Sequence, residues 1–162
     1  MIRSGIGFDA HQLKEGIDLY IGGIKIDSEF GSLGHSDGDA LIHAVADSLL
    51  GAAGMGDIGQ YFSSEKKEWE NAKSEIFLVE VKKILINNGF KISNIDCTVI
   101  LQKPKINPYI KLIRNNISRI LELNEKYVSI KATTTDYLGY IGDSKGWSVI
   151  SIATIIDTNE DC

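Results

Sequence analysis

Residues 147–156, with the sequence WSVISIATII, place apolar side chains on both faces of one expected strand. Trp147 and Val149 fall on one face and Ile150 and Ile152 on the other, because successive side chains of a strand point in opposite directions. Such a strand is expected to be covered on both faces. Helices can cover one face, and a symmetric partner subunit is the economical cover for the other.

The rest of the chain alternates between strand and helix patterns. Strands are expected at 2–9, 97–102 and 127–132, with a hairpin at 19–26 around Gly22-Gly23. Apolar spacing predicts a helix at about 39–53 and a second one that carries Phe77, Val81, Ile84 and Leu85 on one stripe and is stopped by Gly89. Asn107-Pro108 is expected to cap and begin a third. Residues 31–39 and 54–59 are rich in turn formers. This order predicts an α+β fold, a mixed β-sheet with helices packed on one face as a two-layer sandwich.

Length and charge narrow the class of protein. The 162 residues contain no repeat or low-complexity linker, so residues 1–162 are expected to form a single domain. The net charge of −5 argues against nucleic-acid binding, which needs a basic face. No stretch approaches the roughly 18 apolar residues of a membrane helix, so no membrane partner is expected. No secretory signal is recognised and two cysteines are too few for a disulfide framework, so we expect a cytoplasmic protein.

All three histidines lie in the first third of the chain. Asp9 and His11 stand two residues apart in an expected strand, so they share a face, and His43 projects from the following helix. Two imidazoles and a carboxylate can hold a metal and leave a position open for substrate. Asp47, one turn beyond His43, either orients the imidazole of His43 from behind the metal or is a solvated carboxylate. His35 precedes a helix N-terminus, where an anion is favoured, although it can equally be a turn residue.

Six segments, in order, resemble motifs of the cyclodiphosphate synthase family. They are GIGFDAH at 5–11, GHSDGD at 34–39 continuing to His43-Ala44, LGAA at 50–53, GDIG at 56–59, QKPK at 102–105 and KATTT at 131–135. Each segment alone is a weak signal. Their order and spacing across nearly the whole chain make the resemblance specific.

The resemblance implies a homotrimer around a central sheet-lined core, with active sites at subunit interfaces. It implies a small-molecule substrate, 4-diphosphocytidyl-2-C-methyl-D-erythritol 2-phosphate, which is converted to the 2,4-cyclodiphosphate and CMP on the way to isoprenoid precursors. Zn²⁺ is expected on Asp9, His11 and His43, and a second divalent cation, Mg²⁺ or Mn²⁺, on Asp136. His35 and Thr134 match residues that stabilise the transition state.

The same resemblance assigns the substrate-binding residues. The metal ligands Asp9 and His11, together with His35, Ser36, Asp57, Ile58, Gly59, Phe62 and Ser64, are expected around the phosphates and the methylerythritol unit. The cytidine and diphosphate are expected against Leu101, Gln102, Lys103, Pro104, Lys105, Ile106, Asn107, Thr133, Thr134, Thr135, Asp136 and Tyr140.

The chain departs from the family pattern at several of these positions. Ser64 stands where a carboxylate is usual, and Asp136 is one methylene shorter than the usual Glu. Asp143 and Lys145 stand where the family shows Arg and Glu, so an ion pair could persist with its charges exchanged. Because that arginine of relatives lies near a cavity on the threefold axis, we predict that this chain binds isoprenoid diphosphates weakly or not at all there.

Two other functions are compatible with the same three metal ligands. One is a zinc-dependent phosphodiesterase or hydrolase. The other is a non-catalytic trimer with a structural metal, which a closed four-ligand site would favour.

Overall fold

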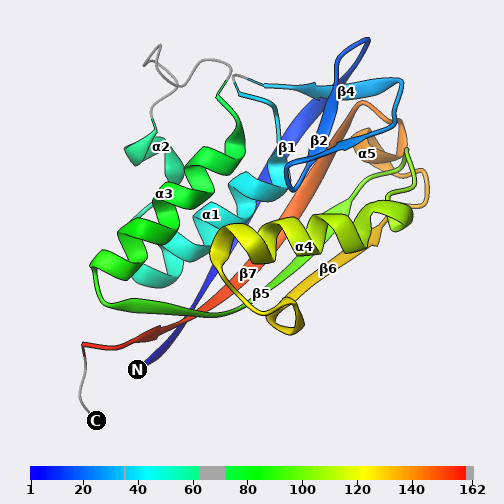
Figure 1. Cartoon of the computed structure of the whole chain (residues 1–162). Helices are drawn as coiled ribbons and strands as arrows, with labels where there is room; N and C mark the ends of the chain where they lie inside the picture. Colours follow the sequence, from blue (N-terminus) through cyan, green and yellow to red (C-terminus); the bar gives the residue numbers. More distant parts are fainter. Residues whose placement is uncertain (35, 63–71, 160–162) are drawn as a thin grey trace.

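The structure is a computed structural model, and it describes residues 1–34, 36–62 and 72–159. Its main sheet has the strand order β4 (Phe30–Leu33), β1 (Ile2–Glu15), β7 (Gly146–Asp157), β5 (Phe90–Ile100) and β6 (Val128–Thr133). All neighbours are antiparallel except β5 and β6, which run parallel. The helices α1 (Ala40–Ala53), α3 (Ser74–Asn87) and α4 (Ile110–Leu121) pack on one face (Figure 1). The expected α+β sandwich is confirmed.

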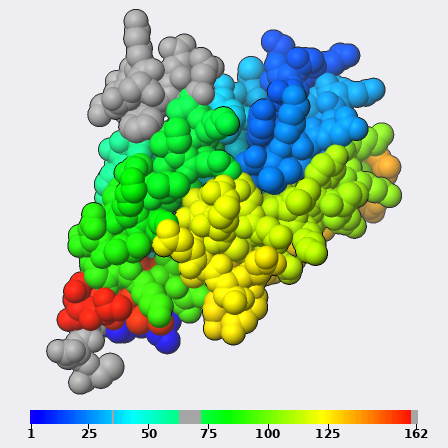
Figure 2. Space-filling view, viewed as in Figure 1, coloured from blue at the N-terminus to red at the C-terminus, as the bar shows by residue number. Residues whose placement is uncertain are grey.

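Shorter elements complete the molecule. The hairpin of β2 (Leu19–Ile21) and β3 (Ile24–Ile26) is confirmed, and it packs beside α4 and α3, as Figure 2 shows. The others are α2 (Ile58–Tyr61), α5 (Gly139–Gly142) and the 3₁₀ turns η2 (Asn107–Tyr109) and η3 (Glu125–Tyr127). None of the helices in the described ranges has the length and apolar character needed to cross a membrane.

The two faces of the sheet differ sharply in burial. On the helical face of β7, Trp147, Val149, Ala153 and Ile155 are fully buried. The opposite face carries apolar side chains that are between 37% and 73% exposed in this single chain, namely Ile2, Ile6, Phe8, Ile150, Ile152 and Ile156. Within the chain, therefore, only one of the two faces of the last strand is covered.

Glycines set the distance between β1 and α1. Gly5 and Gly7 lie on the helical face of β1, and a Cβ at either would collide with backbone atoms of α1, those of Ser48 and Ala52 for Gly5 and of Ala44 for Gly7. The strand therefore lies directly against the helix backbone. Asp9 and His11 continue the same face of β1, and they meet His43 in the first turn of the same helix.

Four expectations about the elements are wrong. β1 continues to Glu15 instead of ending at Asp9, since its alternating pattern persists through pairing with β7 and β4. β5 begins at Phe90, seven residues before the expected start, and residues 31–33 of the expected turn belong to the edge strand β4, which begins at Phe30. Asn107 does not cap α4: it begins a 3₁₀ turn without a side-chain capping bond, and α4 follows from Ile110.

Candidate functional site

The two expected histidine ligands and the aspartate converge at one point between β1 and α1. Asp9 Oδ2 lies 3.1 Å from His11 Nε2 and 3.0 Å from His43 Nδ1. The two imidazole nitrogens lie 3.4 Å apart. Asp9 and His11 are half-buried and His43 is buried at 9% exposure, so the group is accessible from one side.

Hydrogen bonds within the triad shift the pKa values of Asp9 and His43 in opposite directions. Burial acts to raise the pKa of Asp9, but the hydrogen bonds from His11 and His43 outweigh it and hold that pKa well below its usual range. Burial acts to lower the pKa of His43, and its hydrogen bond with Asp9 outweighs this and raises the pKa. Asp9 and His43 therefore stabilise each other's charged forms.

The triangle of ligand atoms fits a tetrahedral metal. Bonds of about 2.0–2.1 Å from a metal to nitrogen or oxygen ligands place neighbouring ligands about 3.3 Å apart in tetrahedral geometry. The three observed separations of 3.0, 3.1 and 3.4 Å are close to this value. No fourth histidine, cysteine or carboxylate joins the group among the residues that the structure describes. A divalent metal here would keep an open coordination position.

The other imidazole nitrogen of His43 faces two serines. Its Nε2 lies 3.0 Å from Ser74 Oγ and 3.4 Å from Ser36 Oγ. For Asp47, the sequence leaves open a partner of this ring or a solvated carboxylate; in the structure its Oδ1 accepts a hydrogen bond from the Ile58 N–H at 2.8 Å. Asp47 thus joins α1 to the start of α2. Ser74 lies 31 residues from His43 on another helix, and no spacing in the sequence points to it.

Two of the expected phosphate- and substrate-binding residues, His35 and Ser64, lie outside the described residues. The segment 57–62 approaches the triad through Phe62. The centroid of the Phe62 ring lies 5.0 Å from that of the Phe77 ring, and the Phe77 centroid lies 6.1 Å from that of the His43 ring. Asp57 is exposed, and its carboxylate accepts from the Gln60 N–H at the start of α2. Ile58 and Gly59 form the first turn of that helix.

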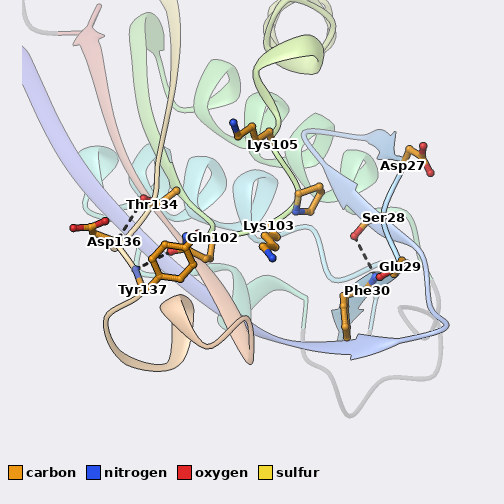
Figure 3. Close-up of a pocket in the computed structure, with 11 residues that line it drawn as sticks. Asp27, Ser28, Glu29, Phe30, Gln102, Lys103, Lys105, Thr134, Asp136 and Tyr137 are labelled. Atoms are coloured by element: carbon orange, nitrogen blue, oxygen red, sulfur yellow. Dashed lines mark hydrogen bonds between the residues drawn. The ribbon is translucent and has the colours of Figure 1, made fainter.

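A second group of the expected residues lines two adjoining cavities at the ends of β5 and β6. The larger, about 870 Å³, has Gln102, Lys103, Pro104, Lys105, Thr134 and Asp136 along its wall. Figure 3 shows Lys103 between Gln102 and the segment 28–30, which leads into β4. The smaller, about 210 Å³, is lined by Leu101, Gln102, Pro104, Lys105, Ile106, Asn107, Ala132, Thr133 and Thr134.

The threonine segment forms a tight turn at the mouth of the larger cavity. Asp136 and Tyr137 have positive φ angles of 53° and 65°, and the Tyr137 N–H donates to Gln102 Oε1 at 3.2 Å. Thr134 Oγ1 accepts from the Asp136 N–H at 3.3 Å (Figure 3). Thr135 Oγ1 donates to the Leu138 carbonyl. Asp136 is exposed and lies in the wall of the larger cavity.

The triad and the two cavities are separate features of one chain. Neither cavity has Asp9, His11 or His43 in its wall, and neither includes Thr135 or Tyr140. The exchanged charges at 143 and 145 do form an ion pair, with Lys145 Nζ 2.9 Å from Asp143 Oδ2, as expected from the sequence.

Comparisons with known proteins identify relatives over nearly the whole length. The model of the YgbB family matches residues 2–156. The 2-C-methyl-D-erythritol 2,4-cyclodiphosphate synthase of Clostridium novyi is 49% identical over 154 residues, which is 95% of this chain and 98% of that protein. The solved structure of IspF from Plasmodium falciparum, a CDP complex, is 37% identical with a TM-score of 0.86, covering 98% of this chain and 97% of that chain.

The same fold also occurs within longer proteins. The structure of the bifunctional IspDF from Campylobacter jejuni has a TM-score of 0.93 and 36% identity over 99% of this chain. This chain spans only 44% of that one.

Proposed function

Since this chain belongs to the YgbB family, we propose that it converts 4-diphosphocytidyl-2-C-methyl-D-erythritol 2-phosphate to 2-C-methyl-D-erythritol 2,4-cyclodiphosphate and CMP. The substrate's own 2-phosphate attacks the β-phosphorus, and the bond from that phosphorus to the oxygen of CMP breaks. A phosphate is already ionised at neutral pH, so the attacking group needs no base. The product belongs to the non-mevalonate route to isoprenoid precursors.

The observation that carries this proposal is the open triangle of Asp9 Oδ2, His11 Nε2 and His43 Nδ1. These atoms would hold Zn²⁺, and their nitrogen-rich set suits that ion. When bound, the ion supplies Lewis-acid polarisation of a phosphate oxygen. The open position favours a catalytic over a structural metal, because structural zinc sites are usually closed by four protein ligands.

The chain's own residues do the positioning. Lys103 and Lys105 stand exposed at the larger cavity and can neutralise the diphosphate. The exposed carboxylate of Asp136 would hold a second ion, Mg²⁺ or Mn²⁺, with few protein ligands, as Mg²⁺ prefers beside phosphates. His35 and Thr134 would donate hydrogen bonds to phosphate oxygens as charge moves in the transition state. Asp57 and Gly59 would hold the hydroxyls of the methylerythritol unit.

The smaller cavity suits the cytidine. Its wall combines the apolar side chains of Leu101, Ile106 and Ala132 with backbone groups that can read a base edge. The CDP complex of the Plasmodium falciparum protein, whose fold this chain shares, supports a cytidine nucleotide as occupant.

The complete site is proposed to form between subunits of a homotrimer. The exposed apolar face of the sheet needs a cover, and the metal triad lies apart from the two cavities within one chain. A neighbouring subunit that covers the face would bring its cavity loops to the triad. A cytoplasmic location is proposed as well, because the buried Cys97 is a free thiol, which is usual in a reducing compartment.

The reaction is tested by phosphorus NMR of the full chain with substrate, Zn²⁺ and Mg²⁺. Stoichiometric CMP and cyclic diphosphate are expected. An open-chain product would assign a hydrolase instead, and absence of turnover with bound zinc would assign a structural metal.

Asp9→Asn tests the metal triad. Because the change removes a charged ligand without changing side-chain size, it is expected to abolish stoichiometric zinc and to lower kcat by at least about 100-fold, consistent with losing several kcal/mol of transition-state stabilisation. Asp18→Asn is the matched control, since Asp18 is exposed and pairs with Lys25. Unchanged zinc content in Asp9→Asn, measured by metal analysis, would remove Asp9 from the ligand set.

A further inference from the structure

The side of His43 that faces away from Asp9 and His11 is enclosed by a short chain of hydrogen-bonding groups. His43 Nε2 lies 3.0 Å from Ser74 Oγ. Ser74 is the first residue of α3 and is fully buried, and its Oγ is in close contact with Asp37 Oδ1. The Ser74 backbone N–H also donates to Asp37 Oδ2 at 2.9 Å. The order of groups is therefore imidazole, hydroxyl, carboxylate.

The protons in this chain have one consistent arrangement when a metal is bound. Nδ1 of His43 points at Asp9 and His11, and a nitrogen that binds a metal carries no proton. The single imidazole proton then sits on Nε2 and is donated to Ser74 Oγ. The hydroxyl of Ser74 has its own proton left, and the carboxylate of Asp37, which can only accept, receives it.

We propose that Ser74 and Asp37 are positioning residues of the metal centre, which fix the tautomer and the ring orientation of His43. The proposal rests on the metal role assigned to the triad under the proposed function. Metal-bound histidines commonly donate their second ring nitrogen to a fixed acceptor, and loss of that acceptor typically costs 10–100-fold in metal affinity. Here the acceptor comes from a different helix, so the start of α3 takes part in holding a ligand carried by α1.

Ser36 does not replace Ser74 as the acceptor of the proton on His43 Nε2. Its Oγ lies 3.4 Å from His43 Nε2 and 3.4 Å from Ser74 Oγ, at the outer limit of a hydrogen bond in both cases. The distance of 3.0 Å makes Ser74 the better acceptor. Ser74 is also the one whose hydroxyl and backbone N–H are both held by a carboxylate.

The role of the hydroxyl can be separated from the capping of α3. Asp37 accepts the backbone N–H of Ser74, which satisfies a free donor at the helix start whatever side chain stands at position 74. Ser74→Ala therefore removes the hydroxyl between His43 and Asp37, and it keeps the hydrogen bond from the backbone N–H of residue 74 to Asp37. Ser74→Thr keeps a hydroxyl and serves as the conservative rescue.

The test is the affinity of the metal-free full chain for Zn²⁺, measured in competition with a chromophoric chelator. Ser74→Ala is expected to bind Zn²⁺ about 10–100-fold more weakly than the unaltered chain, with Ser74→Thr recovering most of the loss. Ser48→Ala is the matched control: Ser48 is also a fully buried serine, it lies on the same helix as His43, and its hydroxyl bonds to Ser151 and the Val45 carbonyl. It is expected to change zinc affinity by less than about twofold.

A second variant and a second readout cover the case in which Ser74→Ala does not fold. Asp37→Asn retains an oxygen acceptor but loses the charge, and it is expected to weaken zinc binding by about 10-fold. In the zinc-bound chain, nitrogen-15 NMR should show the His43 proton on Nε2, exchanging slowly with solvent because Ser74 is buried.

Each result bears on the proposal. Two results would contradict the positioning role of Ser74 and leave the metal assignment in place. One is equal zinc affinity of Ser74→Ala and the unaltered chain. The other is a loss of zinc affinity in Ser48→Ala equal to that in Ser74→Ala. A proton on Nδ1 in the zinc-bound chain would contradict that role as well. Failure of the unaltered chain to bind Zn²⁺ would instead contradict the metal assignment itself.

Discussion

The fully buried carboxylate of Asp39 is enclosed by backbone N–H groups from two elements. It accepts from Gly22 at 3.0 Å and Gly23 at 2.6 Å in the β2–β3 hairpin, and from Ile42 at 3.1 Å in the first turn of α1. Burial raises the pKa of Asp39, and these donors act against that rise. The residue fastens the hairpin to the helix that presents His43.

Asp39→Ala is expected to lower the free energy of unfolding by about 2–4 kcal/mol, because it leaves buried N–H groups without an acceptor and removes a helix cap. Urea denaturation measures this change. Asp27→Ala, an exposed aspartate just after the same hairpin, should change the free energy by less than about 0.5 kcal/mol. Equal stabilities of the two variants would show that the Asp39 cluster is not a fastening point.

Cys97 is a second residue whose behaviour follows from its surroundings. Its thiol is buried under α1 and donates to Ser151 Oγ, and burial raises its pKa to about 12. In a Cys162→Ser background, the folded chain should therefore react with iodoacetamide at pH 8 at least about 100-fold more slowly than the chain in urea. Mass spectrometry over time checks this, and prompt alkylation of the folded chain would show that the site opens.

At the scale of elements, the site depends on how closely β1 lies to α1. Gly5 and Gly7 leave no space between strand and helix backbones, and this proximity lets His43 reach Asp9. Gly7→Ala puts a methyl group against the Ala44 carbonyl and is expected to cost about 1–3 kcal/mol of stability. Because strand and helix must separate, zinc affinity should fall with it.

Gly51→Ala is the control for that experiment. Gly51 lies on α1, where a Cβ meets a single atom at an ordinary contact distance of 3.8 Å, and alanine favours a helix. Its stability should be unchanged or slightly higher by calorimetry. A Gly7→Ala variant as stable as this one would argue against close packing as the cause.

The elements that could be predicted from the sequence are those with a strong local pattern. α1 was predicted nearly to its ends, since Asp39 marks its start and Gly54 its left-handed end. The second half of β1 was not, because its exposed positions are polar and its pairing with β4 is non-local. The metal triad could be predicted because Asp9 and His11 share a strand face and the ordered family motifs include all three residues, whereas their spacing alone is a weak pattern. Ser74 could not be, because a serine at a helix start has many ordinary uses and its partner is distant in sequence.

At the scale of the whole molecule, the fold leaves one apolar face of the sheet uncovered, and we expect this face to form the contact between subunits. Ile152→Glu places a charge in this face and is expected to shift sedimentation from trimer to monomer and to lower activity by at least about 10-fold. Ile86→Glu is the matched control, since Ile86 is similarly exposed but lies on α3, on the opposite side of the sheet. A monomeric chain with full activity would contradict the shared site.

Because the metal triad and the cavity loops are separate within one chain, two variants damaged in different parts should complement each other when their subunits mix. Two variants that are expected to be inactive, Asp9→Asn in the triad and Thr134→Ala in the cavity loop, each leave the other part of the site intact. If subunits of the two exchange freely in equal amounts, about a quarter of the interfaces join two undamaged halves. Mixing the two inactive variants should therefore restore about a quarter of the activity of the unaltered chain, whereas either variant alone should remain inactive.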